Sequence, residues 1–262
     1  MKTKAARLRE LISKGAVMMP GVPNASMARQ VEQAGFDAIY VSGAGMINST
    51  AGMPDIGLLS RDEVVRLARY VARGARIPAI VDADTGFGEG EEVAQTIRDL
   101  TIVDLSTMTA RIKAAVAARK DKDFLIIART DACAVEGFAR AVERAGEYLA
   151  AGADAIFPEA LQTAEEFRDF AKQIEQPLMA NMTEFGKSPL LSFKQLQDFG
   201  YRMIIFPQSA FRISMKATEK FFAALKKAGT QNDWLEQMQT RQELYDLLEY
   251  DPAAEEWKGL HD

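Results

Sequence analysis

Two aspartates in the segment Ala79–Asp84 have the residue type and spacing that most directly suggest chemistry. Asp82 and Asp84 lie two apart on a predicted strand, so their side chains point to the same side of it. Two like charges this close are costly unless a cation lies between them, and a hard ion such as Mg²⁺ needs only one or two carboxylates. We therefore expect a divalent-metal site here. The alternative is that Asp84 caps the turn at Thr85–Gly86 and Asp82 pairs with a Lys or Arg.

Polar side chains also follow the other predicted strands. Arg129 ends one of them, and its planar fork of donors suits a carboxylate, unless it forms an internal pair with Asp131 that stabilises the fold. The small residues Ser42–Gly45 offer backbone N–H groups to an anion, although such turns are common without a ligand. The remaining polar residues at strand ends are Glu159, Asn181, Thr183, Glu184 and Ser209.

Our candidate catalytic residues are Tyr40, Arg129 and Glu159. Tyr40 directly precedes the small-residue turn, where it is either a core residue or places its hydroxyl at the mouth of the site. Glu159 is either a satisfied polar cap or part of a site shared by several strands. Cys133 has no nearby cationic partner in the sequence and is interpreted as structural. His261 is the only histidine, so a metal site built from several histidines is excluded.

Seven short apolar runs predict the strands that must position these residues. Each is followed by a turn and an amphipathic, helix-period stretch. The runs lie at 16–19, 38–41, 79–81, 124–128, 155–157, 177–180 and 203–206. Runs this continuously apolar indicate a parallel sheet that is buried on both faces, with helices outside it. Gly35, Gly152 and Gly200 precede three of the strands and are predicted to end helices.

The positions of the polar residues favour a barrel over an open sheet. The carboxyl ends of barrel strands meet at one face, where such enzymes place their sites, and no glycine-rich dinucleotide motif marks an open sheet. The count is one strand short of eight. The stretch between Phe87 and Phe124 must already hold helices at 91–100 and 107–119, and only 101–106 could form a short fourth strand. We predict an α/β fold, a (β/α)8 TIM-type barrel with one β/α unit shortened or missing.

Length and composition set further limits. The 262 residues fit a single barrel domain spanning 1–262, with a C-terminal helical tail at about 213–262. The tail is expected to contain two helices, one from Met215 to Ala228 and a C-terminal one from Asp233 to Tyr250. A net charge of −5 without a basic run argues against nucleic acid and membrane as partners. A single cysteine, no signal-peptide pattern and no spanning apolar stretch lead us to expect a cytoplasmic protein.

Several segments, in their order along most of the chain, resemble the isocitrate lyase and phosphoenolpyruvate mutase superfamily, and within it the methylisocitrate lyases. The segments shared with the whole superfamily are 40–45, 52–57, 81–88, 127–132 and 157–160. Those typical of the methylisocitrate lyases are Thr183–Gly186, Ser209–Arg212 and Met238–Arg241.

The resemblance implies a reaction and a set of site residues. Asp82 and Asp84 would hold Mg²⁺, or Mn²⁺ in its place, with Asp55 in support. The substrate-binding residues implied are Ser42, Gly43, Ala44, Arg129, Glu159, Asn181, Thr183, Arg212 and Arg241. The implied enzyme is a carbon–carbon lyase that cleaves 2-methylisocitrate, a small tricarboxylate, into pyruvate and succinate during propionate catabolism. The family also implies a homotetramer with an exchanged C-terminal helix.

One family feature is absent from the sequence. Members of the family carry a strand ending in His-Ile-Glu-Asp and a loop with a Lys-Lys-Cys-Gly-His motif, whose cysteine is the general acid; Cys133 does not match it. Either the sequence is incomplete at this point and numbered without a break, or the deletion is real. We favour the first, because losing a barrel strand exposes core and leaves backbone groups unpaired. A real deletion predicts binding of Mg²⁺ and pyruvate with extremely slow cleavage.

Two alternative functions follow from the same residues. A related enzyme of the superfamily would act on dimethylmalate, oxaloacetate or a phosphonopyruvate, although Thr183–Gly186 and Arg241 argue against this. A non-catalytic binder of Mg²⁺ and carboxylates is the second alternative, and the missing cysteine loop favours it.

Overall fold

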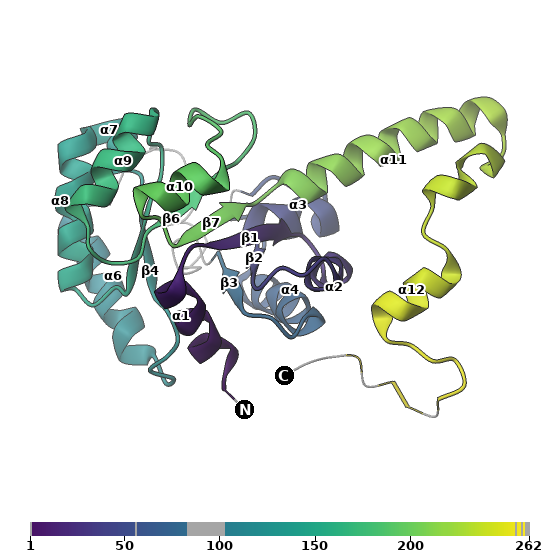
Figure 1. The fold of residues 1–262 in the computed structure, drawn as a ribbon, viewed down its shortest axis with the longest axis horizontal. Coiled ribbons are helices and arrows are strands. Elements are labelled where there is room, and N and C mark those ends of the chain that lie inside the picture. The colour runs from purple at the N-terminus through teal and green to yellow at the C-terminus, as the bar shows by residue number, and fades with distance from the viewer. Residues whose placement is uncertain (1, 56, 83–102, 255, 258, 260–262) are drawn as a thin grey trace.

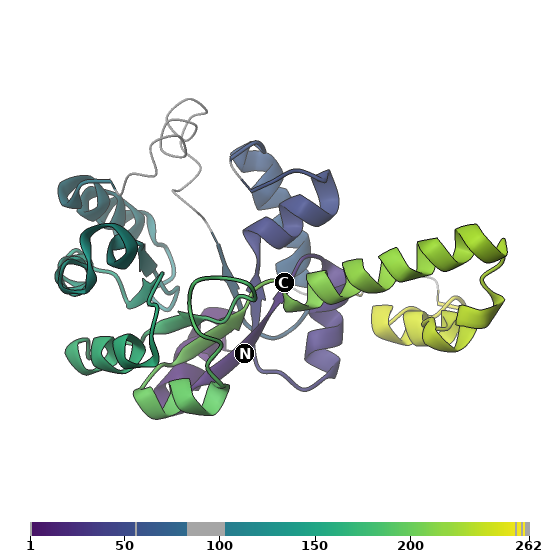
Figure 2. The ribbon, with the colours of Figure 1, turned by 90° about the horizontal axis from the view of Figure 1, so that it is seen from above.

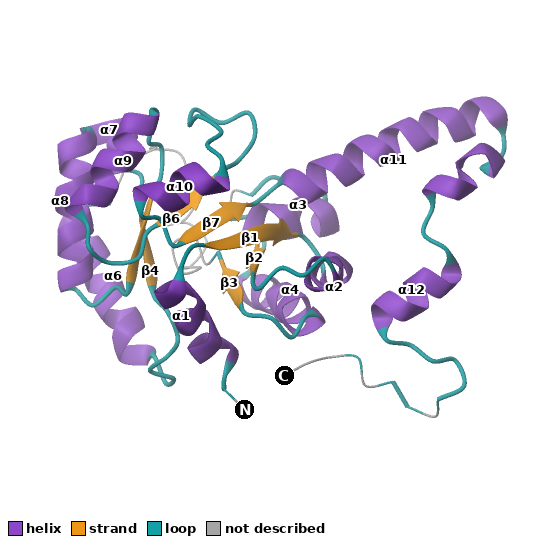
Figure 3. Ribbon diagram, viewed as in Figure 1, coloured by secondary structure: helices purple, strands orange, loops and turns teal. Residues whose placement is uncertain are grey.

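Seven strands surrounded by helices form the body of the protein (Figure 3). The computed structural model describes all residues except 1, 56, 83–102, 255, 258 and 260–262. The strands are β1 (Val17–Val22), β2 (Ile39–Val41), β3 (Ala79–Val81), β4 (Ile127–Thr130), β5 (Ala155–Pro158), β6 (Met179–Asn181) and β7 (Met203–Phe206). Each overlaps or directly adjoins a predicted apolar run, so all seven predicted strands are confirmed.

The helices alternate with these strands. In chain order they are α1 (Lys4–Lys14), α2 (Ala25–Gln33), α3 (Gly43–Ala51), α4 (Arg61–Gly74), α6 (Leu105–Ala118), α7 (Ala132–Glu136), α8 (Phe138–Ala150), α9 (Ala164–Gln173), α10 (Phe193–Phe199), α11 (Ser209–Ala228), the 3₁₀ helix η1 (Asn232–Gln237) and α12 (Arg241–Leu248). Gly35, Gly152 and Gly200 have φ values of 85°, 105° and 108°. This left-handed backbone suits glycine and confirms their predicted place at helix ends.

The strands are all parallel and form an open arc of a barrel. Five are paired in the order β3-β2-β1-β7-β6, and β4 pairs with β5. A parallel bridge between Ile156 and Leu178 joins the two groups. The described residues contain no strand between β3 and β4, and 83–102, where the shortened unit was expected, lie outside them. The predicted TIM-type α/β architecture is present in the described residues.

The candidate fourth strand at 101–106 is wrong for its last two residues. Leu105 and Ser106 begin α6, because the Asp104 side chain accepts a hydrogen bond from Thr107 N–H and caps that helix. Val103 and Asp104 are in no strand, and 101–102 lie outside the described residues. The helix predicted at 91–100 also lies outside them.

Alternate residues of the strands separate an inner from an outer core. The inner cluster has Met19, Tyr40, Ile80, Phe157 and Met203 at its centre, and Leu8 and Ile12 of α1 pack against it. Each of these strand residues is followed two positions later by a residue that faces the same side. Side chains just beyond the strand ends therefore continue the interior of the barrel toward its open face.

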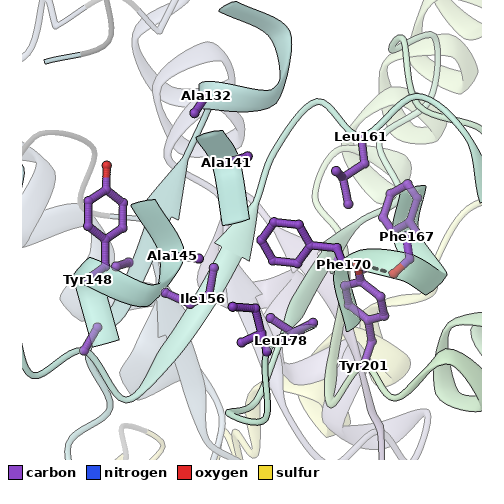
Figure 4. Close-up of a cluster of buried hydrophobic side chains, with 14 of the residues drawn as sticks. Ala132, Ala141, Ala145, Tyr148, Ile156, Leu161, Phe167, Phe170, Leu178 and Tyr201 are labelled. Atoms are coloured by element: carbon purple, nitrogen blue, oxygen red, sulfur yellow. Dashed lines mark hydrogen bonds between the residues drawn. The ribbon is translucent and has the colours of Figure 1, made fainter. Parts of the chain in front are cut away.

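The outer core lies between the strands and the surrounding helices. Ile156, Leu178, Phe167, Phe170 and Tyr201 are at most 2% exposed and pack together (Figure 4). The Tyr201 hydroxyl donates to the carbonyl of Phe167 at 3.2 Å, so its polar atom is satisfied inside this layer. A second outer cluster packs α2 and α4 on β1 and β2.

A cluster of charged groups closes the amino-terminal end of the barrel. Asp154 accepts hydrogen bonds from Arg9 at 2.9 Å, Arg119 at 2.7 Å and the Ile126 N–H at 2.9 Å. Arg9 also donates to the carbonyl of Asp123. Burial alone raises the pKa of Asp154, but these donors and the two charges outweigh burial and hold the pKa below its ordinary value. The cluster joins α1, α6 and β5.

We predict that Asp154→Ala lowers the free energy of unfolding by about 2–4 kcal/mol at pH 7, because two partly buried arginines lose their carboxylate. Urea unfolding measures this. Since the pKa of Asp154 is lowered by folding, its stabilisation is complete above its ordinary unfolded pKa and disappears as the pH falls through the folded value. The control, Asp169→Ala, removes an exposed ion pair with Lys172 and should cost less than about 1 kcal/mol. Equal losses for both variants contradict the prediction.

The C-terminal segment extends away from the barrel and then folds back (Figures 1 and 2). The helix predicted from Met215 begins earlier, at Ser209. The single helix predicted for 233–250 is wrong, because the chain is extended at Met238 between η1 and α12. Thr240 starts α12 anew through a capping box with Glu243. No helix in the described residues is long and apolar enough to cross a membrane.

Contacts with α2 and α4 hold the returning segment. Arg29, 5% exposed, donates to the carbonyls of Leu247 and Gly259. Arg76 donates to both carboxylate oxygens of Glu249, at 2.5 and 2.7 Å. α12 therefore packs on α2, on the outside of the barrel.

Candidate active site

The polar residues predicted to form a site gather at the carboxyl ends of the parallel strands. Asp82, Arg129, Glu159 and Asn181 each stand two positions after a residue of the inner cluster or packed on it. The alternation of strand side chains turns them toward the barrel axis. The site therefore lies directly on the apolar barrel interior.

Two acidic side chains approach each other beside Gly43. A Cβ atom at Gly43 would lie 3.6 Å from Asp55 Oδ2 and 3.7 Å from Asp82 Cβ. The Tyr40 hydroxyl, which rises from the inner cluster, donates to Asp82 Oδ2 at 2.8 Å. Burial, and then the charge of Asp82, raise the pKa of the Asp55 carboxyl. The acidic pair is thus held together although its like charges repel.

This donor set fits a hard divalent cation. Carboxylate oxygens are the ligands that Mg²⁺ prefers, and the ion keeps several waters rather than requiring a complete protein cage. The described residues contain no group of three or more acidic, His or Cys side chains that could hold a metal. Asp84, the second predicted ligand, lies outside the described residues. A bound cation would relieve the electrostatic repulsion between Asp55 and Asp82.

The small-residue turn at Ser42 is the start of a helix. Ser42 is the N-cap of α3, and its Oγ accepts from Gly45 N–H at 3.0 Å. The backbone N–H groups of Gly43 and Ala44 thus belong to the first turn, where such groups have no intrahelical partner. Gln208, after β7, donates to Ser42 Oγ at 3.3 Å. A helix amino terminus at a strand end is suited to bind an anionic group such as a carboxylate.

Arg129 is held between two acids, Asp131 and Glu159. Its guanidinium donates to Asp131 Oδ2 at 2.9 Å and Oδ1 at 2.7 Å, lies 3.8 Å from Glu159 Oε2, and covers the ring of Phe157 at 5.3 Å. The internal Arg129–Asp131 pair, the alternative considered from the sequence, is therefore present. Burial lowers the pKa of Arg129, but the charges of Asp131, Glu159 and Asp82 outweigh it and raise the pKa. The last contribution means that the charge of Asp82, one member of the acidic pair, acts on Arg129.

Asn181 has a polar atom without a partner. Its Nδ2 donates to Glu159 Oε2 at 3.3 Å, while its Oδ1 is buried and has no hydrogen-bond partner among the described residues. A buried unsatisfied acceptor costs free energy unless a bound group donates to it. The geometry of Asn181 therefore suits a ligand hydroxyl or a water.

Thr183 and Arg212 follow two neighbouring strands, β6 and β7. Thr183 follows β6, and Arg212 is in the first turn of α11 after β7. Arg212 Nη1 donates to the carbonyl of Glu184 at 2.6 Å and to its Oε2 at 3.2 Å. The loops after β6 and β7 are thereby joined next to Asn181.

Arg241 is not brought to this site within one chain. It is the first residue of α12, is exposed, and is separated from the strand ends because α11 carries the chain outward before α12 returns to α2 (Figure 1). Cys133, in α7, packs against the outer core, and burial raises the pKa of its thiol, which agrees with a structural role. His261 lies outside the described residues.

Sequence reasoning did not identify three contacts of the site: Gln208 on Ser42, Phe157 under Arg129, and Glu184 on Arg212. Each joins residues on different strands or loops, so no local spacing signals it. Their location in the sequence was the one signal that could have identified them. All three partners lie at or beside the carboxyl ends of strands, where polar or aromatic side chains can reach residues of neighbouring strands.

Comparison with known proteins identifies related sequences. A protein-family model described as phosphoenolpyruvate phosphomutase matches residues 8–103 and 99–226. A protein from Aeropyrum pernix named 2-methylisocitrate lyase is 45% identical over 269 aligned residues, which cover 93% of this chain and 86% of the relative. The alignment has 269 positions, yet it covers only 93% of the 262 residues of this chain. The alignment therefore contains gaps in this chain, at positions where the relative has residues that this chain lacks. The family match breaks near residue 100, close to the expected gap.

Solved structures of related proteins have the same fold. A structure of 2,3-dimethylmalate lyase superposes with a TM-score of 0.85 at 31% identity and covers 94% of this chain and 95% of that one. A complex of phosphonopyruvate hydrolase with oxalate and Mg²⁺ has a TM-score of 0.82 at 27% identity and covers 94% of this chain and 95% of that one.

Proposed function

The chain belongs to the phosphoenolpyruvate phosphomutase family and is a carbon–carbon lyase, and on that premise we propose that it is Mg²⁺-dependent and cleaves 2-methylisocitrate into pyruvate and succinate. The observation that carries the proposal is the acidic pair Asp55 and Asp82, which lies beside a helix amino terminus and whose Asp82 charge acts on Arg129. This arrangement offers one place for a cation and another for the carboxylate that the cation binds.

Asp82, Asp84 and Asp55 are the residues that would hold the metal. The related phosphonopyruvate hydrolase was solved as a complex with oxalate and Mg²⁺, which supports the proposal that this site binds Mg²⁺ and a small carboxylate. A bound Mg²⁺ supplies Lewis-acid polarisation of the oxygens on the pyruvate half of the substrate. Tyr40 fixes Asp82 through a hydrogen bond of 2.8 Å, so the carboxylate keeps its direction when the ion arrives.

The other residues bind and orient the substrate. The N–H groups of Gly43 and Ala44, behind the Ser42 cap, receive the carboxylate of the pyruvate half. Asn181 accepts a hydrogen bond from the substrate through its unpaired Oδ1. Arg129, which lies beside Glu159, and Arg212 balance the negative charge on the succinate half through their guanidinium groups. We assign Thr183, which follows β6, to the same substrate pocket.

A panel of substrates tests the specificity. Purified protein with Mg²⁺ is incubated separately with 2-methylisocitrate, 2,3-dimethylmalate, oxaloacetate and phosphonopyruvate, and products are followed by mass spectrometry over long times. We expect pyruvate and succinate from 2-methylisocitrate in excess of any product from the others. The likeness to 2,3-dimethylmalate lyase makes that substrate the second candidate, and preferential cleavage of dimethylmalate overturns our choice.

We also propose that the protein forms a homotetramer through its C-terminal segment. α11 is twenty residues long, yet none of its residues is buried in the single chain. Ile213, Met215 and Phe222 on this helix are 71%, 54% and 61% exposed. Exposed apolar residues in such a cluster commonly mark an interface. Light scattering that gives the mass of a single chain contradicts this proposal.

A further inference from the structure

The loop after β6 and helix α11 are joined at the site through a single guanidinium. Arg212 Nη1 donates to the Glu184 carbonyl at 2.6 Å and to Glu184 Oε2 at 3.2 Å. The other carboxylate oxygen of Glu184 accepts from the hydroxyl of Ser209, one turn before Arg212 on the same helix. Glu184 is thus held by the helix whose arginine it contacts.

Phe185 covers one face of the same arginine. Its ring lies 5.3 Å from Arg212 Cζ, a distance typical of cation–π contact. Its backbone has φ of 63°, which is unfavourable for a non-glycine residue, and its side chain is 94% exposed. Burial of the Phe185 ring therefore cannot compensate for the unfavourable backbone conformation. The strained backbone instead places the ring against the guanidinium, as expected where structure serves a site.

These contacts leave part of the guanidinium available. They use Nη1 and one face of the guanidinium, and among the described residues the Arg212 side chain has no other hydrogen bond. Nε and Nη2 form the edge of the fork that matches the two oxygens of a carboxylate. The arginine is therefore fixed in orientation but still able to bind a ligand.

We propose that Glu184 is a positioning residue: it orients Arg212, with the help of Phe185, for the second carboxylate of the substrate, the one on the succinate half. The inference rests on the proposed function and deepens it by assigning recognition of the two ends of the substrate to different loops. The pyruvate half is bound at Asp82 and Ser42. Glu184 acts only at the other end.

Calorimetric titration of the full chain with two probes separates these ends. Oxalate with Mg²⁺ reports on the metal end, and succinate reports on Arg212. We expect Glu184→Ala to weaken succinate binding about 10-fold while the oxalate affinity changes less than about 2-fold, because a charge-assisted contact to Arg212 is lost. Glu184→Gln, which keeps one acceptor oxygen, should recover part of the loss. Glu165→Ala, an exposed glutamate on α9, is the control and should change neither affinity.

A double-mutant cycle with Arg212→Ala completes the test. If Glu184 acts through Arg212, then adding Glu184→Ala to the Arg212→Ala variant has no further effect on succinate. An additive loss, an equal loss of both probes, or tighter succinate binding by Glu184→Ala overturns the inference while leaving the proposed function standing. Unmodified protein that binds no oxalate with Mg²⁺ overturns the proposed function itself.

Discussion

Asp82→Asn is expected to weaken Mn²⁺ binding, and with it oxalate binding, on the order of 100-fold or more. Asp82 is the described carboxylate that both approaches Asp55 and is oriented by Tyr40. Asparagine keeps the size and one oxygen but removes the charge that a hard divalent cation requires. Electron paramagnetic resonance of free Mn²⁺ measures the metal affinity directly, without turnover.

Two further variants make that result specific. Tyr40→Phe removes only the hydroxyl that orients Asp82, so we expect a smaller loss of Mn²⁺ affinity, about 10-fold. Asp37→Asn, on the outside of the barrel beside Arg7, should leave the affinity unchanged. Mn²⁺ binding by Asp82→Asn at the affinity of the unmodified protein contradicts the assignment of this residue to the metal.

The second large effect concerns turnover. If the purified protein has a mass of 28.9 kDa, it lacks the family's cysteine loop. We then expect it to cleave 2-methylisocitrate about 10²–10⁴-fold more slowly than the Aeropyrum pernix relative. The reason is that the proposed site would bind and polarise the substrate, but the described residues include no identified acid to protonate the succinate carbon. Succinate release under saturating Mg²⁺, measured for both proteins side by side, gives the ratio.

A chimera provides the matched control for that comparison. Insertion of the relative's extra positions at the junction of the two family matches should raise the rate, while oxalate binding stays as it was. A mass well above 28.9 kDa for the purified protein would show instead that residues are missing from the sequence. Turnover at the relative's rate by the verified 262-residue chain refutes the role given to the absent loop.

The strands could be predicted because their signal is local. Runs such as Ala38–Val41 and Met203–Phe206 are apolar throughout, and a parallel strand buried on both faces needs no more than that. Gly35 and Gly200 marked helix ends for an equally local reason, since their backbone must turn left-handed. The barrel then followed from where the polar residues fall. The shortened unit was visible as a stretch too short for its elements.

The pairs inside the site could not be predicted in the same way. Tyr40 with Asp82 and Gln208 with Ser42 join residues far apart in the sequence, so only the assembly of β3, β2, β1 and β7 into one sheet creates them. The break before α12 is different. Thr240 and Glu243 form a Ser/Thr-x-x-Glu capping signal that was readable in the sequence, and the helical spacing of apolar residues across it masked the new start.

Metal removal from the unmodified chain tests the central claim most directly. Oxalate is titrated calorimetrically into the protein in the presence of Mg²⁺ and again after chelation with EDTA. We expect binding with Mg²⁺ and a loss of affinity of about 100-fold or more without it, because the acidic pair Asp55 and Asp82 repels an anion unless a cation lies between them. Equal affinity under the two conditions, or no binding in either, contradicts a metal site that holds a small carboxylate.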